Sequence, residues 1–128
     1  MSLRVASKWG QITLRLGNGM ADLVVVLITA PNEDHAAKMA NDIVASGLAA
    51  CVNIIRNIRS IYRWQGKIED EGEVLMLVKT RKEHFKDLEK RIRELHPYTV
   101  PEIIALPIIE GFEGYLGWLK EETAKEQG

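Results

Sequence analysis

One thiol and one imidazole are the side chains of this sequence best suited to hold a metal ion. Cys51 is the only cysteine, and His96 stands directly before a proline. A thiolate sulfur and an imidazole nitrogen both suit copper and zinc. Two ligands are too few for a tight site, so we expect copper or another divalent cation to bind with low affinity. Glu73, Glu102, water or a partner subunit would have to complete the coordination shell.

Both residues also admit a structural interpretation. Cys51 starts an apolar stretch, where a free cysteine packs as a small hydrophobic residue. His96 stands where a helix is expected to end, and its imidazole would cap the last carbonyls. The other two histidines, His35 and His84, fall on polar helix faces, so we expect both to be solvated.

The familiar catalytic patterns do not occur in this sequence. It contains no nucleophile elbow, no glycine-rich phosphate loop and no HExxH motif. Cys51 would become an activated thiolate only if His96 lay beside it and the thiol pKa were lowered. We therefore predict that the protein is not an enzyme and carries no organic cofactor. Catalysis on a small polar substrate through Cys51, His96 and Glu102 remains an alternative.

Size and composition predict a single globular domain. The chain has 128 residues, of which 46% are apolar and 27% charged, too apolar for an intrinsically disordered chain. A net charge of −1 provides no field that would attract a phosphate backbone, so nucleic-acid binding is not expected. A single cysteine cannot form an intrachain disulfide, which suits a reducing compartment, and we expect a cytoplasmic protein.

Neither a membrane span nor a secretory signal is expected. The longest clean apolar run, residues 23–28, is far shorter than the roughly 18 residues that a span requires. Residues 1–19 lack an apolar signal core, and we interpret them as an N-terminal extension, disordered or added during cloning. Residues 20–128 then form the domain. The alternation of Ile12, Leu14 and Leu16 would instead fit an edge strand.

Hydrophobic periodicity predicts a strand and a helix in the first half of the domain. Residues 23–28 are a continuous apolar run rich in β-branched residues, typical of a central strand covered on both faces. Asn32 has cap chemistry for a helix over about 33–46, and Gly47 stands where a left-handed C-cap would fall.

From residue 51 to residue 80 the apolar pattern has period two, which predicts one long hairpin. Gln65–Gly66 is the expected turn, and a bulge is expected around residues 70–72. Arms of about 14 residues reach on the order of 45 Å. A compact chain of this length is only about 36 Å across, so the apolar tip should overhang and be sheltered by a partner.

The last third of the sequence predicts a helix, a strand and a short closing helix. Thr80–Glu83 fits a capping box for the helix, which should end at His96 before the proline. Residues 102–109 form a strand in which Pro107 indicates an edge or bulge. Apolar spacing over 112–119 marks the closing helix.

The resulting order is that of a ferredoxin-like βαββαβ unit with an extra C-terminal helix, in the α+β class. Right-handed crossovers would place both main helices on one face of a four-stranded sheet and leave the other face bare. Docking onto sister subunits would cover the hairpin tip, the sheet edge and the bare face together. We therefore predict a homo-oligomer with cyclic symmetry.

Six segments resemble the CutA divalent-cation-tolerance family, in order and over about residues 20–119. They are LITAPNE (27–33), LAACVNI (48–54), SIYRWQGKIE (60–69), EVLMLVKT (73–80), HPYTVPEIIALPI (96–108) and YLGWL (115–119). The resemblance implies a ferredoxin-like homotrimer whose long hairpins engage neighbouring subunits, in a shape similar to the PII signalling proteins. It also implies binding of copper or other divalent metals and a role in metal tolerance.

The resemblance further implies a cleft between subunits. The residues that match the family's cleft are Trp64, Glu73, Lys79, Tyr98 and Glu102. A lysine, carboxylates and aromatic walls would hold a small anion or a polar metabolite, as expected of a PII-like signalling or scaffold trimer. In a purely structural interpretation the aromatic residues anchor the interface and the lysine forms an interfacial ion pair.

The sequence departs from some metal-binding members of the family. Those members have a cysteine at the position of Ile28, a second histidine at that of Leu95, and an acidic or amide residue at that of Thr99. Of their metal-binding set only His96 is present here. The resemblance therefore does not imply their complete copper site.

Overall fold

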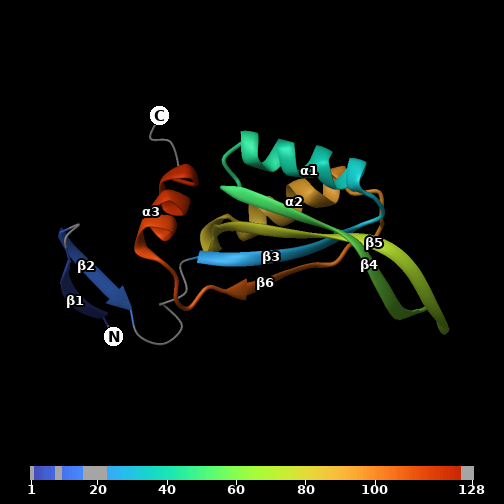
Figure 1. Ribbon diagram of the computed structural model, residues 1–128, viewed down its shortest axis with the longest axis horizontal. Coiled ribbons are helices and arrows are strands. Elements are labelled where there is room, and N and C mark those ends of the chain that lie inside the picture. The colour runs from blue at the N-terminus through green and yellow to red at the C-terminus, as the bar shows by residue number, and fades with distance from the viewer. Residues whose placement is uncertain (1, 8–9, 16–22, 125–128) are drawn as a thin grey trace.

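The computed structural model describes residues 2–7, 10–15 and 23–124. Its main unit is a four-stranded antiparallel sheet in the order β4-β5-β3-β6, with helices α1 and α2 on one side (Figure 1). The elements are β3 Leu23–Ala30, α1 Glu33–Ala45, β4 Cys51–Trp64, β5 Lys67–Arg81, α2 Phe85–Leu95, β6 Ile103–Pro107 and α3 Glu113–Glu122. This confirms the predicted ferredoxin-like α+β fold with an extra C-terminal helix.

Strand β3 lies inside the sheet, as its β-branched run predicts. It pairs antiparallel with β5 on one side and β6 on the other. Its even-numbered side chains face the helices, and Val26 and Ile28 are fully buried together with Met76 and Val78 of β5 and Leu88 of α2. Complete burial of one such side chain stabilises the fold by roughly 1.5–3 kcal/mol.

Local chemistry explains both ends of α1. The Asn32 side chain accepts a hydrogen bond from the His35 backbone N–H at 2.9 Å and so caps the first turn. Gly47 has φ +79°, the left-handed conformation that ends a helix at little steric cost. His35 is exposed, as predicted.

Two predictions about the start of α2 are wrong. Strand β5 continues to Arg81, and the buried Thr80 hydroxyl donates to Leu48 O at 2.5 Å instead of capping the helix. A 3₁₀ turn, η2 Lys82–His84, precedes α2. His84 is buried rather than solvated, because the chain after α3 returns over it and the carbonyl of Thr123 accepts a hydrogen bond from Nε2 at 2.5 Å.

The β4–β5 hairpin turns where predicted and bulges elsewhere. Gln65 and Gly66 have φ values of 49° and 79°, which fit a tight two-residue turn. The bulge lies on β4, where Arg56 and Asn57 together face Val74, and not near residues 70–72. Asn57 has φ 61°, and asparagine tolerates this left-handed conformation better than most residues. The hairpin bends away from the sheet beyond this point (Figure 1).

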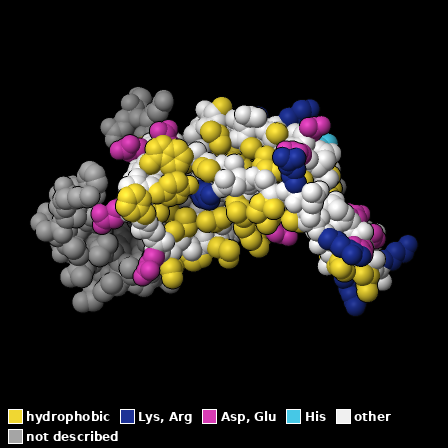
Figure 2. Space-filling model, viewed as in Figure 1, with side chains coloured by type: hydrophobic (Ala, Val, Ile, Leu, Met, Phe, Trp, Pro, Cys, Tyr) yellow, Lys and Arg dark blue, Asp and Glu magenta, His cyan; other side chains and the backbone are white. Residues whose placement is uncertain are grey.

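The sheet face opposite the helices carries an apolar surface. Strand β6 is an edge strand, as Pro107 indicates, and it is shorter than the predicted 102–109 because it ends at that proline. Its side chains Ile104 and Leu106 are each 50% exposed, and Ile55 of β4 is 43% exposed. Figure 2 shows hydrophobic side chains gathered in a broad band over this face and towards α3. Ile55, Ile104 and Leu106 are therefore left partly exposed by the rest of residues 23–124.

The first described residues form a small sheet of their own. Strands β1 Ser2–Ser7 and β2 Gly10–Arg15 pair antiparallel, and β2 contains Ile12 and Leu14 of the predicted alternation. Leu16 lies outside the described residues. Two paired strands thus lie within the segment that was predicted to be an extension. The division of the chain into an extension, 1–19, and a domain, 20–128, stays a prediction. None of the helices in the described ranges is long and apolar enough to cross a membrane.

Candidate functional site

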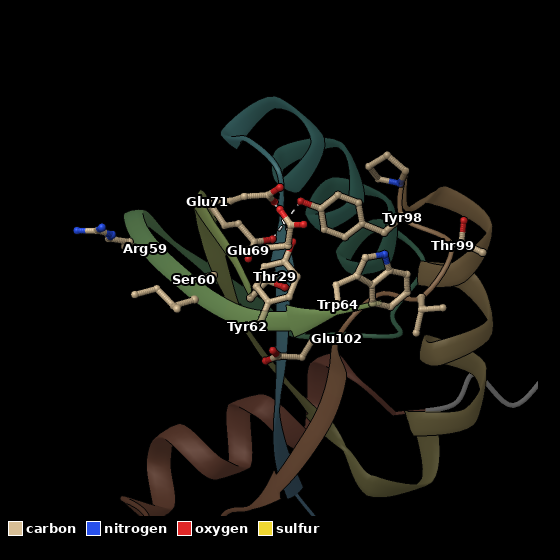
Figure 3. Close-up of a pocket in the computed structure, with 14 residues that line it drawn as sticks. Thr29, Arg59, Ser60, Tyr62, Trp64, Glu69, Glu71, Tyr98, Thr99 and Glu102 are labelled. Atoms are coloured by element: carbon tan, nitrogen blue, oxygen red, sulfur yellow. Dashed lines mark hydrogen bonds between the residues drawn. The ribbon is translucent and has the colours of Figure 1, made fainter. Parts of the chain in front are cut away.

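A cavity of about 950 Å³ lies between the outer half of the hairpin and the loop that follows α2. The hairpin contributes side chains from both of its arms, and the loop contributes residues 97–100 (Figure 3). The bulge at Arg56–Asn57 bends the hairpin, and a bulge is a common means of redirecting side chains next to a site. We call this cavity the hairpin pocket.

Four carboxylates line the hairpin pocket. Glu69, Glu71 and Glu73 alternate along β5, so the strand directs all three to the same side, and Glu102 precedes β6. None of the ion pairs formed within residues 23–124 includes any of the four. The hairpin pocket therefore carries an excess of negative charge.

Aromatic side chains form the other part of the wall. The Tyr98 hydroxyl donates to Glu73 Oε2 at 3.0 Å, and the Tyr62 hydroxyl donates to Glu71 Oε2 at 3.0 Å. Burial, and then the bond to Glu73, raise the pKa of Tyr98 to about 12. Both tyrosines are therefore neutral donors at ordinary pH. The Trp64 ring stands between the hairpin and the loop, facing the same hollow (Figure 3).

One cationic side chain borders the hairpin pocket, and an acid outside the cavity neutralises it. Arg59 donates from Nε and Nη2 to the two carboxylate oxygens of Asp70, at 2.8 and 2.6 Å. This fork holds the pKa of Asp70 below its ordinary value. In Figure 3 the Arg59 guanidinium points away from the other labelled side chains.

His96 is held on both ring nitrogens by backbone groups. Nε2 donates to Thr29 O at 2.8 Å, and Nδ1 accepts from the Tyr98 N–H at 3.0 Å. The two bonds require the neutral tautomer with its proton on Nε2. The residue is buried and its backbone N–H caps the end of α2. The imidazole thus positions Tyr98, and neither ring nitrogen is free for a metal ion in this conformation.

Cys51 lies on the uncovered sheet face, half-buried, at the far end of the ladder. It pairs in register with Lys79, and the Lys79 ammonium and the Cys51 thiol both donate to Asn53 Oδ1, the thiol at 3.8 Å. Burial and the neighbouring Cys51 sulfur raise the pKa of Tyr115, which reaches this site from α3. The structure thus places a thiol, an ammonium and a phenol together on this face.

The structure brings some predicted site residues together and separates others. Trp64, Glu73, Tyr98 and Glu102 all line the hairpin pocket, whereas Lys79 does not. Cys51 pairs with Lys79 of β5. His96 contacts Thr29, which pairs with Leu75 of β5. Lys79 and Leu75 are four residues apart on β5, so the thiol and the imidazole are offset by about 13 Å along the strand. One protomer therefore does not bring the thiol and the imidazole together.

Metal coordination within one chain has no preformed centre in the described part of the protein. No three side chains of His, Cys, Asp or Glu converge there as metal ligands would. Ile28, where some relatives have a cysteine, is fully buried on the helix-covered face. The predicted site did not include Glu69, Glu71 and Tyr62. The alternating acids of β5 were a signal for Glu69 and Glu71.

Three comparisons with known proteins agree. The family model described as CutA1 divalent ion tolerance protein matches residues 24–122. A divalent-cation tolerance protein CutA of Thermus thermophilus is 54% identical over 99 residues, which are 77% of this chain and 96% of the relative. The chloroplastic CutA protein of Arabidopsis thaliana is 46% identical over 100 residues, 78% of this chain and 55% of the relative.

Solved structures show the same similarity. The divalent cation tolerance protein of Thermus thermophilus superposes with a TM-score of 0.78 at 53% identity, covering 80% of this chain and 99% of that one. The CutA1 structure from Oryza sativa gives a TM-score of 0.79 at 40% identity, with 83% and 97% covered. The Thermus thermophilus protein is named as a tolerance protein, and none of these four names is that of an enzyme.

Proposed function

Because the chain belongs to the CutA1 divalent ion tolerance family, we propose that it acts in divalent-cation tolerance as a homotrimer that binds copper or a similar ion. The observation that carries the proposal is the exposed apolar surface of the sheet face, together with the exposed apolar side chains at the tip of the hairpin. Apolar surface of this extent marks a contact with another protein. A closed ring of identical chains covers such a face on every copy.

The proposed metal site lies on the same face. Cys51 offers a soft ligand there, and a neighbouring subunit placed against the sheet would bring further ligands within reach. His96 would join only if its bond to the carbonyl of Thr29 or to the N–H of Tyr98 opened. Such a site has few ligands and low affinity. The single cysteine also supports the cytoplasmic location that we propose.

Two measurements test this function. Light scattering after gel filtration should give a mass three times the 14.4 kDa of one chain. Calorimetry with Cu(II), Cu(I) and Zn(II) should show binding that Cys51→Ser weakens and that Cys51→Ser with His96→Ala abolishes. A well-folded single copy at micromolar concentration would overturn the trimer, and unchanged binding in the double variant would remove both ligands from the site.

A second function is favoured by the hairpin pocket, whose volume of about 950 Å³ suits a small metabolite. In this alternative the protein is a PII-like signalling or scaffold trimer that reads a ligand through Trp64, Glu73, Tyr98 and Glu102. A thermal-shift screen of metabolites tests it, and a uniformly null result would oppose it. The enzyme alternative needs Cys51 beside His96, which one protomer does not provide. If the Cys51 thiol does not react with iodoacetamide at neutral pH, the enzyme alternative is excluded.

A further inference from the structure

The hairpin pocket has the chemistry of a site for positively charged organic molecules. We infer that it binds a linear organic cation with two or more ammonium groups, held by the carboxylates of β5 and by aromatic rings. The inference rests on the second of the functions proposed above and names the substrate class of that site. It is independent of the metal site around Cys51.

The hairpin pocket contains a buried carboxylate that lacks a cationic partner. Glu73 is 7% exposed and lines the hairpin pocket. Its carboxylate accepts one neutral hydrogen bond, from Tyr98, and forms no ion pair with any residue in 23–124. A buried carboxylate without a counter-charge is costly, so buried charges in proteins are normally paired. A ligand ammonium in the pocket would supply the missing charge.

The carboxylates of β5 are spaced regularly along the hairpin pocket. Glu69, Glu71 and Glu73 occupy alternate positions on one strand, so their Cα atoms repeat at about 6.6 Å. Two ammonium groups joined by four methylene groups lie about 6 Å apart, from carbon–carbon bonds near 1.5 Å. A flexible chain with regularly placed ammonium groups therefore matches the period of the strand. A single inorganic ion could satisfy only one position of this row.

The wall of the hairpin pocket beside the carboxylates is largely aromatic. Tyr62 pairs in register with Glu69, and Ser60 pairs with Glu71, so each acid has a neighbour from β4 on its own side of the hairpin. Trp64 and Tyr98 present further ring surface to the same cavity. The face of an aromatic ring attracts an ammonium group, and methylene groups pack against it. The wall thus suits the charged and the apolar parts of such a ligand.

Neither an anion nor a bare metal ion suits the pocket as well. The small anion expected from the sequence would need a free cation, but Arg59 is bound to Asp70 and Lys79 lies elsewhere on the sheet. Four unpaired carboxylates would repel an anion. A bare metal ion needs converging donors, and none of the described residues form such a group.

Calorimetry with defined probes tests the inference. Butane-1,4-diamine should bind the wild-type assembly at least roughly fivefold more tightly than butylamine, which has the same carbon chain and one charge. Magnesium chloride at equal concentration should not displace it, and inorganic phosphate should not bind. Equal affinity for diamine and monoamine would overturn the row of carboxylates as the recognition element. Displacement by magnesium, or binding of phosphate instead of diamine, would overturn the ligand class.

Isosteric variants locate the site. Glu71→Gln and Glu69→Gln, both on the outer hairpin, should each weaken diamine binding roughly fivefold. Glu73→Gln should weaken it more, since the buried charge is lost while the amide oxygen still accepts from Tyr98. Glu121→Gln on the exposed surface of α3 is the matched control and should have no effect. Diamine affinity unchanged in Glu69→Gln and Glu71→Gln would overturn the site, whether or not Glu73→Gln folds.

Crossed measurements separate this inference from the metal proposal. Cys51→Ser should leave diamine affinity unchanged, and Glu71→Gln should leave copper affinity unchanged. Loss of diamine binding in Cys51→Ser would show that the hairpin pocket is not an independent site. Absence of any diamine binding to a correctly assembled trimer would overturn the inference and leave the metal proposal standing.

Discussion

The inner and outer halves of the β4–β5 hairpin have the same secondary structure and opposite surroundings. In the inner half alternate side chains such as Met76 and Val78 are completely buried beneath the helices. In the outer half the large apolar side chains Ile61 and Ile68 are 64% and 75% exposed. The bulge at Arg56–Asn57 divides the two. The inner half thus holds one protomer together, and the outer half is available to sister chains and ligands.

The largest effect should come from the inner half. Met76→Ala removes a fully buried side chain and should lower the free energy of unfolding by about 2–5 kcal/mol, measured by urea denaturation. Ile68→Ala is the counterpart in the outer half, and its effect should appear only at protein concentrations where the chains are assembled. An equal loss in both variants at high dilution would erase the distinction between the halves.

The boundary between the halves should respond to backbone strain. Asn57→Val places a β-branched residue at φ 61° and should cost about 1–2 kcal/mol of unfolding free energy. Asn57→Gly accepts the same conformation and is the matched control, with a stability close to that of the wild type. If both variants unfold at the same urea concentration, the left-handed residue does not determine the bend.

The contact between the hairpin and the loop after α2 can be followed by titrating the Tyr98 hydroxyl with alkali. Tyr98 has a pKa raised from 10.0 to about 12, so its stabilising contribution is complete below pH 10 and is lost as the pH rises through about 12. The tyrosinate absorbance that Tyr98→Phe removes should appear near pH 12. Glu73→Gln should move it part of the way towards 10.0, since burial also contributes. A normal titration near pH 10 would mean that the hydroxyl is solvated.

The smallest effects should come from two exposed ion pairs. Arg91 donates to both carboxylate oxygens of Asp42 between the helices, at 2.8 and 2.6 Å, and Arg59 binds Asp70 in the same way on the outer hairpin. Each arginine lowers the pKa of its partner acid from 3.8, so each contribution is present above pH 3.8 and is lost as the pH falls below it.

Acid unfolding compares the two pairs. Asp42→Asn should lower the stability at pH 7 slightly more than Asp70→Asn, because Asp42 is the less exposed acid and links α1 to α2. Each variant should also flatten the fall in stability below pH 4. A larger effect of Asp70→Asn would show that the outer hairpin contributes more to the protomer than its exposure indicates.

Sequence patterns predicted the fold well where one physical signal dominated. The β-branched run of β3, the Asn32 cap of α1 and the Gln65–Gly66 turn each depend on local chemistry, and the structure has all three. Two of the errors lie where a distant segment intervenes. Thr80 matched a capping box but bonds to Leu48, and His84 looked solvated until the chain after α3 returned over it.

The site was predictable in its residue types and less so in its geometry. The family resemblance brought Trp64, Glu73, Tyr98 and Glu102 into one group, and they line one cavity. It also included Lys79, which shares the sheet face of Glu73 by alternation but lies six residues further along β5, on the other side of the bulge. The sign of the charge in the pocket therefore emerged only from the structure. The assignment of Cys51 and His96 as metal ligands stays a prediction.

The short turn at Gln65–Gly66 has a consequence for the order in which the chain folds. Along the β4–β5 ladder even the most distant partners, Cys51 and Lys79, are 79 − 51 = 28 residues apart, and the hairpin can zip from its turn in roughly 1–10 μs. Strand β6 must find β3 across 107 − 24 = 83 residues, from Val24 to Pro107, a far slower closure. During synthesis on the ribosome, the β4–β5 hairpin, which we propose contacts sister chains, can therefore form before β6 completes the sheet.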